Sequence, residues 1–197
     1  MSIADKLTTI AENTPKVYES GKTAEYDRFW DNFQNYGIRR GYEYAFCGAG
    51  WTDETFKPKY PIIATTVQYM FRGAYVTQVP TVDFSGRENL ANAFSYGNKI
   101  VTIEKIIIKD DGTNTFSNFF NACVSLKEVR FEGVIGKAIS FAPCMELSSA
   151  SIDNIIEHLQ DLTGATAQTI TFAATVGNAL TDTQKSNIQS KNWSAVY

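Results

Sequence analysis

The chain has 197 residues, enough for one substantial domain or for a small domain with an appendage. Its formal charge of −3 gives no long-range attraction to a phosphate backbone, so we expect no nucleic-acid partner. Hydrophobic residues make up 44% of the chain and aromatic residues 13%, more than a disordered protein carries, so we expect a folded protein.

The sequence shows no membrane span and no export signal. Its longest aliphatic run, residues 106–108, is far shorter than the roughly 20 apolar residues that cross a bilayer. Asp5 and Lys6 interrupt the stretch that a signal peptide would need. We therefore expect the chain to stay in the compartment where it is made.

Residues 1–36 are predicted to form a helical segment for oligomerisation and anchoring. Apolar and small residues recur at alternating spacings of four and three, as in the seam of a short coiled coil: Ile3, Leu7, Ile10, Thr14 and Val17. The expected partner of this seam is a second copy of the chain. Pro15 and Gly21 interrupt the pattern, so a second helix is expected at about residues 23–35.

The predicted second helix carries aromatic residues at helical spacing, namely Tyr26, Phe29, Trp30 and Phe33. One interpretation is that they dock this helix onto the rest of the protein or onto a neighbouring subunit. The other is an aromatic platform for a sugar, which requires exposed rings.

Residues 40–147 contain an internal repeat of about two dozen residues. Triplets that close on phenylalanine end at positions spaced 25, 23, 26 and 21 residues apart. Strand-like runs follow at residues 103–108 and 129–131. The pattern predicts a short β-solenoid, in which equivalent side chains of successive coils stack into a core ladder. The predicted ladder residues are Phe46, Phe71, Phe94, Phe120 and Phe141, with Ile100, Leu126 and Leu147 six residues after three of them.

The repeat carries a family resemblance. Residues 121–129, Asn-Ala-Cys-Val-Ser-Leu-Lys-Glu-Val, resemble the signature of BspA-like leucine-rich repeats, and the likeness extends over residues 92–147. Residues 3–13, 26–33, 51–60 and 190–193 resemble leucine-rich repeat proteins associated with virions of Firmicutes phages and prophages. The resemblance implies a structural or adhesive role on a virion and transfers no functional residues.

Residues 148–197 are predicted to cap the solenoid. Ser148 can cap a helix that is expected to end at Gly164. Its predicted apolar stripe is Ile152, Ile155, Ile156, Leu159 and Leu162. Residues 168–172 alternate like a strand, Thr181 and Gln184 form a capping box before a shorter helix, and residues 193–197 close as a strand. The overall fold class is therefore expected to be α+β.

Few residues suggest chemistry. His158 is the only histidine and has no catalytic partner in view, and Asp110–Asn114 lacks the ligand spacing of a calcium loop. The cysteines Cys47, Cys123 and Cys144 lack zinc-site spacing and are interpreted as core residues. Arg39–Arg40 and Gly48–Gly50 are interpreted as a solvated turn and a flexible connection. We expect no catalytic residue, cofactor or metal.

These observations and the resemblance predict a non-enzymatic, fibre-like virion protein, located on the virion. It would form a homo-oligomer, with a trimer favoured, contact other virion proteins through residues 1–36, and bind a host-surface glycan or protein through the repeats. One alternative is a bacterial BspA-like surface adhesin or interaction module. Another is a glycan-cleaving enzyme, whose two carboxylates would have to face one groove.

Overall fold

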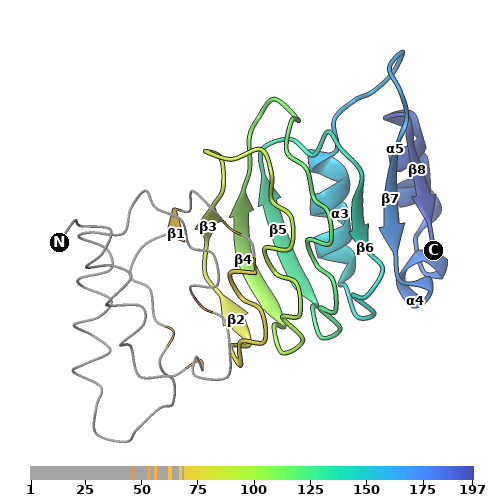
Figure 1. Cartoon of the computed structure of the whole chain (residues 1–197). Coiled ribbons are helices and arrows are strands. Elements are labelled where there is room, and N and C mark those ends of the chain that lie inside the picture. The colour runs from red at the N-terminus through yellow and green to blue at the C-terminus, as the bar shows by residue number, and fades with distance from the viewer. Residues whose placement is uncertain (1–45, 47–52, 54–55, 57–61, 64–66, 68) are drawn as a thin grey trace, which may run out of the picture.

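The computed structural model describes Phe46, Asp53, Phe56, Ile62, Ile63, Val67 and residues 69–197 (Figure 1). The predicted helical segment at residues 1–36 lies outside the described residues. So do its seam residues Ile3, Leu7, Ile10, Thr14 and Val17, and its aromatic residues Tyr26, Phe29, Trp30 and Phe33. The prediction of a coiled coil stays a prediction.

The described chain forms two small open parallel sheets and three helices, so its class is mixed α and β, in agreement with α+β (Figure 1). The first sheet holds β1 (Ile62–Ile63), β2 (Gln78–Val79), β3 (Val82–Asp83), β4 (Thr102–Ile107) and β5 (Glu128–Glu132). The second holds β6 (Ile139–Phe141), β7 (Gln168–Phe172) and β8 (Trp193–Val196). The helices are α3 (Ser149–His158), α4 (Ala174–Asn178) and α5 (Asp182–Ser190).

The first sheet pairs equivalent positions of successive chain segments. Gln78 lies opposite Thr102, which lies opposite Glu128. Val82 likewise lies opposite Ile106, which lies opposite Phe131. On β5 exposed and buried residues alternate, so one face of the strand meets the core and the other meets solvent. The strands predicted at residues 103–108 and 129–131 are confirmed, with small shifts of their ends.

A row of phenylalanines runs through the core. Neighbouring rings are stacked from Phe46 through Phe71, Phe94, Phe120 and Phe141 to Phe172, with centroid separations of 5.3, 5.3, 5.7, 5.0 and 6.1 Å. All six side chains are almost fully buried. Ile100, Leu126 and Leu147 are buried in the same core. We call the six rings the phenylalanine row.

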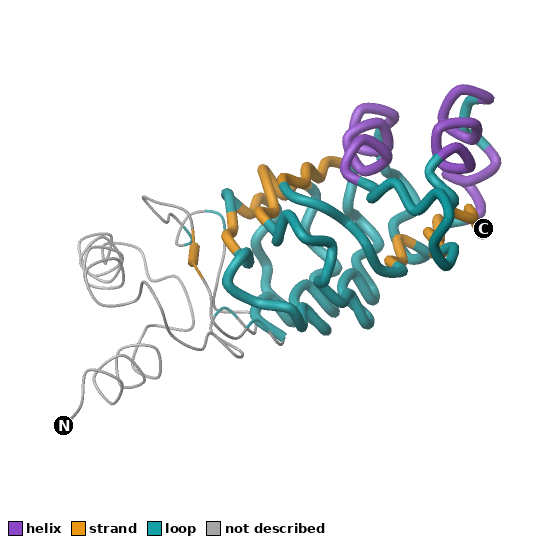
Figure 2. The backbone as a smooth tube through the Cα atoms, turned by 90° about the horizontal axis from the view of Figure 1, so that it is seen from above, coloured by secondary structure: helices purple, strands orange, loops and turns teal. Residues whose placement is uncertain are grey.

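Helix α3 occupies the place of the next strand after β5. Figure 2 shows α3 and α5 continuing the line of the first sheet, while the second sheet lies across from them. The backbone N–H of Val129 donates to Ser151 Oγ at 3.0 Å, and that of Phe131 donates to Asn154 Oδ1 at 2.7 Å. Side chains of a helix thus accept hydrogen bonds that a neighbouring strand would otherwise accept.

Helix α3 begins as predicted and ends earlier than predicted. The Ser148 hydroxyl accepts from the N–H of Ser151, which makes Ser148 the N-cap. The predicted end at Gly164 is wrong, because α3 ends at His158 and Leu159 forms a bridge with Ile135 instead. The Lys191 ammonium donates to the carbonyls of Ile156, Glu157 and Leu159 at 2.9, 2.7 and 2.8 Å and satisfies the helix end.

The remaining C-terminal elements follow the sequence closely. Strand β7 has the predicted bounds, and Thr181 and Gln184 form the predicted capping box of α5. Strand β8 spans Trp193–Val196, and the Trp193 indole donates to Gln160 O at 2.9 Å. The short helix α4 was not predicted. Phe172 extends the phenylalanine row into this part of the chain.

Candidate functional site

Residues with left-handed backbone flank three members of the phenylalanine row. Tyr69 and Gly73 flank Phe71 with φ of 54° and 67°, and Asn92 and Tyr96 flank Phe94 with φ of 59° and 62°. Asn118 and Ala122 flank Phe120 with φ of 51° and 61°. Glycine and asparagine adopt this conformation readily, whereas a bulky side chain costs about 1–2 kcal/mol. The two tyrosines are therefore the unusual residues in this repeated turn.

The two left-handed tyrosines hold one arginine between them. The Arg72 guanidinium carbon lies 5.2 Å from the ring centroid of Tyr69 and 5.0 Å from that of Tyr96. Both contacts lie within the range of a cation–π interaction. Arg72 and Tyr96 are exposed and Tyr69 is half-buried. We call these three residues the tyrosine–arginine cluster.

The charge of Arg72 has no counterion in the described chain. Besides the two ring contacts, its side chain makes no hydrogen bond or ion pair with any residue that the structure describes. By contrast, Lys105, Lys109 and Lys127 are each paired with a glutamate. Stacking occupies the faces of a guanidinium and leaves the N–H donors in its plane for other acceptors.

Backbone hydrogen bonds fix the position of the tyrosine–arginine cluster. The N–H of Arg72 donates to Tyr69 O at 3.1 Å, and the N–H of Gly73 donates to Tyr96 O at 3.1 Å. The N–H groups of the two tyrosines donate to Asn92 O and Asn121 O in the following segments, at 3.0 and 2.6 Å. The three side chains therefore start from a backbone that is tied across successive segments.

Apolar side chains are also exposed at one position of the repeat, four residues after a phenylalanine of the row. Tyr75 is 54% exposed, Val124 is 41% exposed and Met145 is 53% exposed, while the equivalent Asn98 is exposed and polar. The turns that follow the phenylalanine row thus present several large apolar side chains to solvent.

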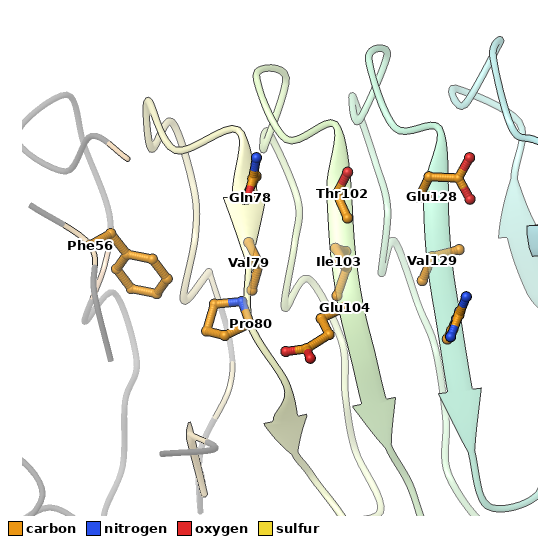
Figure 3. A pocket seen from close by; sticks show the side chains of 10 residues that line it. Phe56, Gln78, Val79, Pro80, Thr102, Ile103, Glu104, Glu128 and Val129 are labelled. Atoms are coloured by element: carbon orange, nitrogen blue, oxygen red, sulfur yellow. The ribbon is translucent and has the colours of Figure 1, made fainter. Parts of the chain in front are cut away.

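A second candidate surface is an open hollow on the first sheet (Figure 3). It has a volume of about 670 Å³ and is lined by residues of β2, β4 and β5 together with Phe56 and Pro80. The Glu104 carboxylate accepts from the N–H and hydroxyl of Thr81, both at 3.1 Å. The Glu128 carboxylate accepts from the hydroxyls of Ser148 and Ser151 at 2.8 and 3.1 Å. Both carboxylates thus hold neighbouring segments together.

The thiols among the described residues are buried. Burial raises the pKa of Cys123 to about 12, and Cys123 Sγ donates to Phe94 O at 3.0 Å. Burial also raises the pKa of Cys144. The thiolate is the nucleophile and metal ligand, so neither group is poised for chemistry. Cys47, Arg39–Arg40 and Gly48–Gly50 lie outside the described residues.

The remaining candidates have structural partners. His158 Nδ1 lies 2.8 Å from Asn154 O, one helical turn earlier. In the turn at residues 110–114, the Asp111 carboxylate accepts from the hydroxyl and N–H of Thr113, which lowers its pKa. Across the residues that the structure describes, no three His, Cys, Asp or Glu side chains gather closely enough to hold a metal ion. None of the helices that the structure describes is long and apolar enough to span a membrane.

Comparisons of the chain with family models, curated proteins and solved structures find no match. Sequence reasoning missed the tyrosine–arginine cluster, although a signal was present. Within the three segments that centre on Phe71, Phe94 and Phe120, the positions that flank the phenylalanine carry asparagine, glycine or alanine except at Tyr69 and Tyr96.

Proposed function

We propose that the protein is a non-enzymatic, fibre-like phage virion protein that presents a leucine-rich-repeat-like solenoid to a host surface. The observation that carries the solenoid is the phenylalanine row, because equivalent rings of successive segments stack at 5.0 to 6.1 Å. A repeat that cannot bury its own apolar face gains a core only by such stacking. The parallel register of β4 with β5 supports the same interpretation.

The binding role is supported by what the repeats expose. In the described chain an arginine lies between two tyrosines whose left-handed backbone is unfavourable for tyrosine. The repeats also expose Tyr75, Val124 and Met145 at one repeat position. Strained, exposed positions of this kind concentrate at ligand sites. Placement on a virion is supported by the resemblance of residues 92–147 and of the flanking segments to phage-associated repeat proteins.

Multivalency would follow from assembly through residues 1–36. Several linked copies of one weak site raise avidity on a repetitive cell surface without new contacts. We expect the full-length chain to be a trimer by light scattering, and the seam substitutions Leu7→Lys and Ile10→Lys to give monomers. Thr8→Lys, outside the seam, is the matched control. A monomeric wild-type chain would contradict self-assembly and redirect the search to a different partner.

The test of function uses particles and cells. Antibodies against the full-length protein should label purified particles of the phage or prophage that encodes the chain, in immuno-electron microscopy. Fluorescently labelled full-length protein should bind host cells. If the antibodies label bacterial envelopes and do not label the particles, the surface adhesin is favoured instead. Loss of host polysaccharide on incubation with the purified protein would favour a glycan-cleaving enzyme.

A further inference from the structure

We propose that the tyrosine–arginine cluster binds an acidic saccharide, with the anionic group on the Arg72 guanidinium and a sugar ring against Tyr96. This inference rests on the proposed binding function and names the chemical class of its ligand. It concerns the turn beside the phenylalanine row and not the hollow on the first sheet.

Arg72 indicates that the ligand carries an anionic group. The guanidinium has no acceptor in the described part of the chain, and its faces are engaged by the rings at 5.2 and 5.0 Å. Its in-plane N–H donors match the two oxygens of a carboxylate or a phosphate. An anion would therefore add paired, charge-assisted hydrogen bonds that no residue in the described part of the chain supplies.

The exposed ring of Tyr96 indicates that the ligand contains a sugar. Tyr96 is 47% exposed although its ring is apolar. The C–H face of a sugar ring is apolar and slightly positive, so it packs well on the electron-rich face of an aromatic ring. Tyrosine adds a hydroxyl that can bond to a sugar hydroxyl. A ligand with both a ring and a negative charge uses both parts of the cluster.

The site is pre-organised for such a ligand. Arg72 and Tyr96 are linked through Gly73, whose N–H donates to Tyr96 O at 3.1 Å, and through the ring contact itself. Little conformational freedom is then lost when a ligand binds. Tyr96 carries its ring at a left-handed φ of 62°, where asparagine or glycine would fit with less strain, and strained positions of this kind concentrate at ligand sites.

The experiment applies the full-length chain to an array of carboxylated and phosphorylated saccharides, each beside its neutral counterpart, with acidic peptides on the same surface. We expect retention on one or more acidic saccharides, at least tenfold weaker binding to the neutral counterparts, and weakening by added salt. Arg72→Gln and Tyr96→Asn should each reduce binding by about tenfold or more. Lys137→Gln removes an exposed positive charge that lies outside both the cluster and the hollow on the first sheet, and it should leave binding unchanged.

Tyr96→Asn separates recognition from folding. Asparagine suits the left-handed backbone, so this variant should unfold at the same or higher denaturant concentration while it loses binding. No retention on any acidic saccharide, stronger retention on acidic peptides, or unchanged binding by Arg72→Gln would each overturn the proposal. If host cells still bind the wild type and both cluster variants equally, the proposed function stands and this site is wrong. If no host cell binds, the array still decides the site.

Discussion

Phe71 and Phe94 stack face to face, with ring centroids 5.3 Å apart and ring planes at 6°, although they belong to successive segments of the chain. The spacing follows from the backbone, because hydrogen-bonded parallel segments lie about 4.8 Å apart. The N–H of Phe71 donates to Ala93 O and so places the two rings in register. The stack is therefore a consequence of register, and its energy depends on every ring being present.

The first prediction concerns Phe94, a ring inside the phenylalanine row that packs against aromatic rings on several sides. It contacts Phe71, Phe84, Phe119 and Phe120. Phe94→Ala should lower the free energy of unfolding by about 3–5 kcal/mol, measured by urea denaturation of the full chain. Val124→Ala, at an exposed position, should change it by less than about 0.5 kcal/mol. Equal effects of the two substitutions would contradict a continuous packed row.

The second prediction concerns the junction of α3 with β5. Ser151→Ala and Asn154→Ala each remove the acceptor of a strand N–H, which should cost about 1–3 kcal/mol. Amide hydrogen exchange of Val129 and Phe131 should speed up in the corresponding variant. Glu157→Gln, an exposed change on the same helix, serves as the control. Unchanged exchange at Val129 in Ser151→Ala would show that another group satisfies this amide.

The third prediction compares two glycines. Gly133 has φ of +103°, and an added Cβ would overlap the carbonyl of Ile108. Gly133→Ala should therefore destabilise the protein by at least about 2 kcal/mol. Gly86 lies in open space outside the left-handed region, so Gly86→Ala should be neutral or stabilise by up to about 1 kcal/mol. Thermal and urea denaturation of the two variants would measure the contrast.

The fourth prediction concerns the buried thiols. Cys123 and Cys144 should resist iodoacetamide at pH 8 in the folded protein and react fully in guanidinium, as read by mass spectrometry of their peptides. Burial raises the pKa of Cys123 from its ordinary value of 9.0 to about 12, so the unfolded chain releases this proton first. Stability should accordingly fall as pH rises above about 9. Rapid alkylation of the folded protein at pH 8 would contradict burial.

The elements that could be predicted are those set by local patterns. The N-cap at Ser148, the strand at residues 168–172 and the capping box at Thr181 all follow from short-range chemistry, and the structure has each of them. The predicted ladder residues from Phe46 to Leu147 are all buried. Their repetition at a nearly constant spacing was visible because each segment must offer the same side chain to the same row.

The elements that could not be predicted depend on partners far away in sequence. The apolar spacing of Leu159 and Leu162 suggested a longer helix, but Leu159 bridges to Ile135, and Lys191 satisfies carbonyls at the end of α3. No sequence pattern near residue 158 predicts either contact. The tyrosine–arginine cluster was missed for a related reason. The repeat shows that its two tyrosines are unusual, but the contact of Arg72 with Tyr96 forms only when successive segments align.

Helix α3 also covers one edge of the first sheet, so no further strand can pair there. An exposed strand edge can recruit a strand from another molecule, and β5 would present such an edge if its N–H groups were open. Here Ser151 and Asn154 accept those N–H groups from within the same chain. Along β5 the helix therefore blocks edge-to-edge pairing with a strand of another molecule.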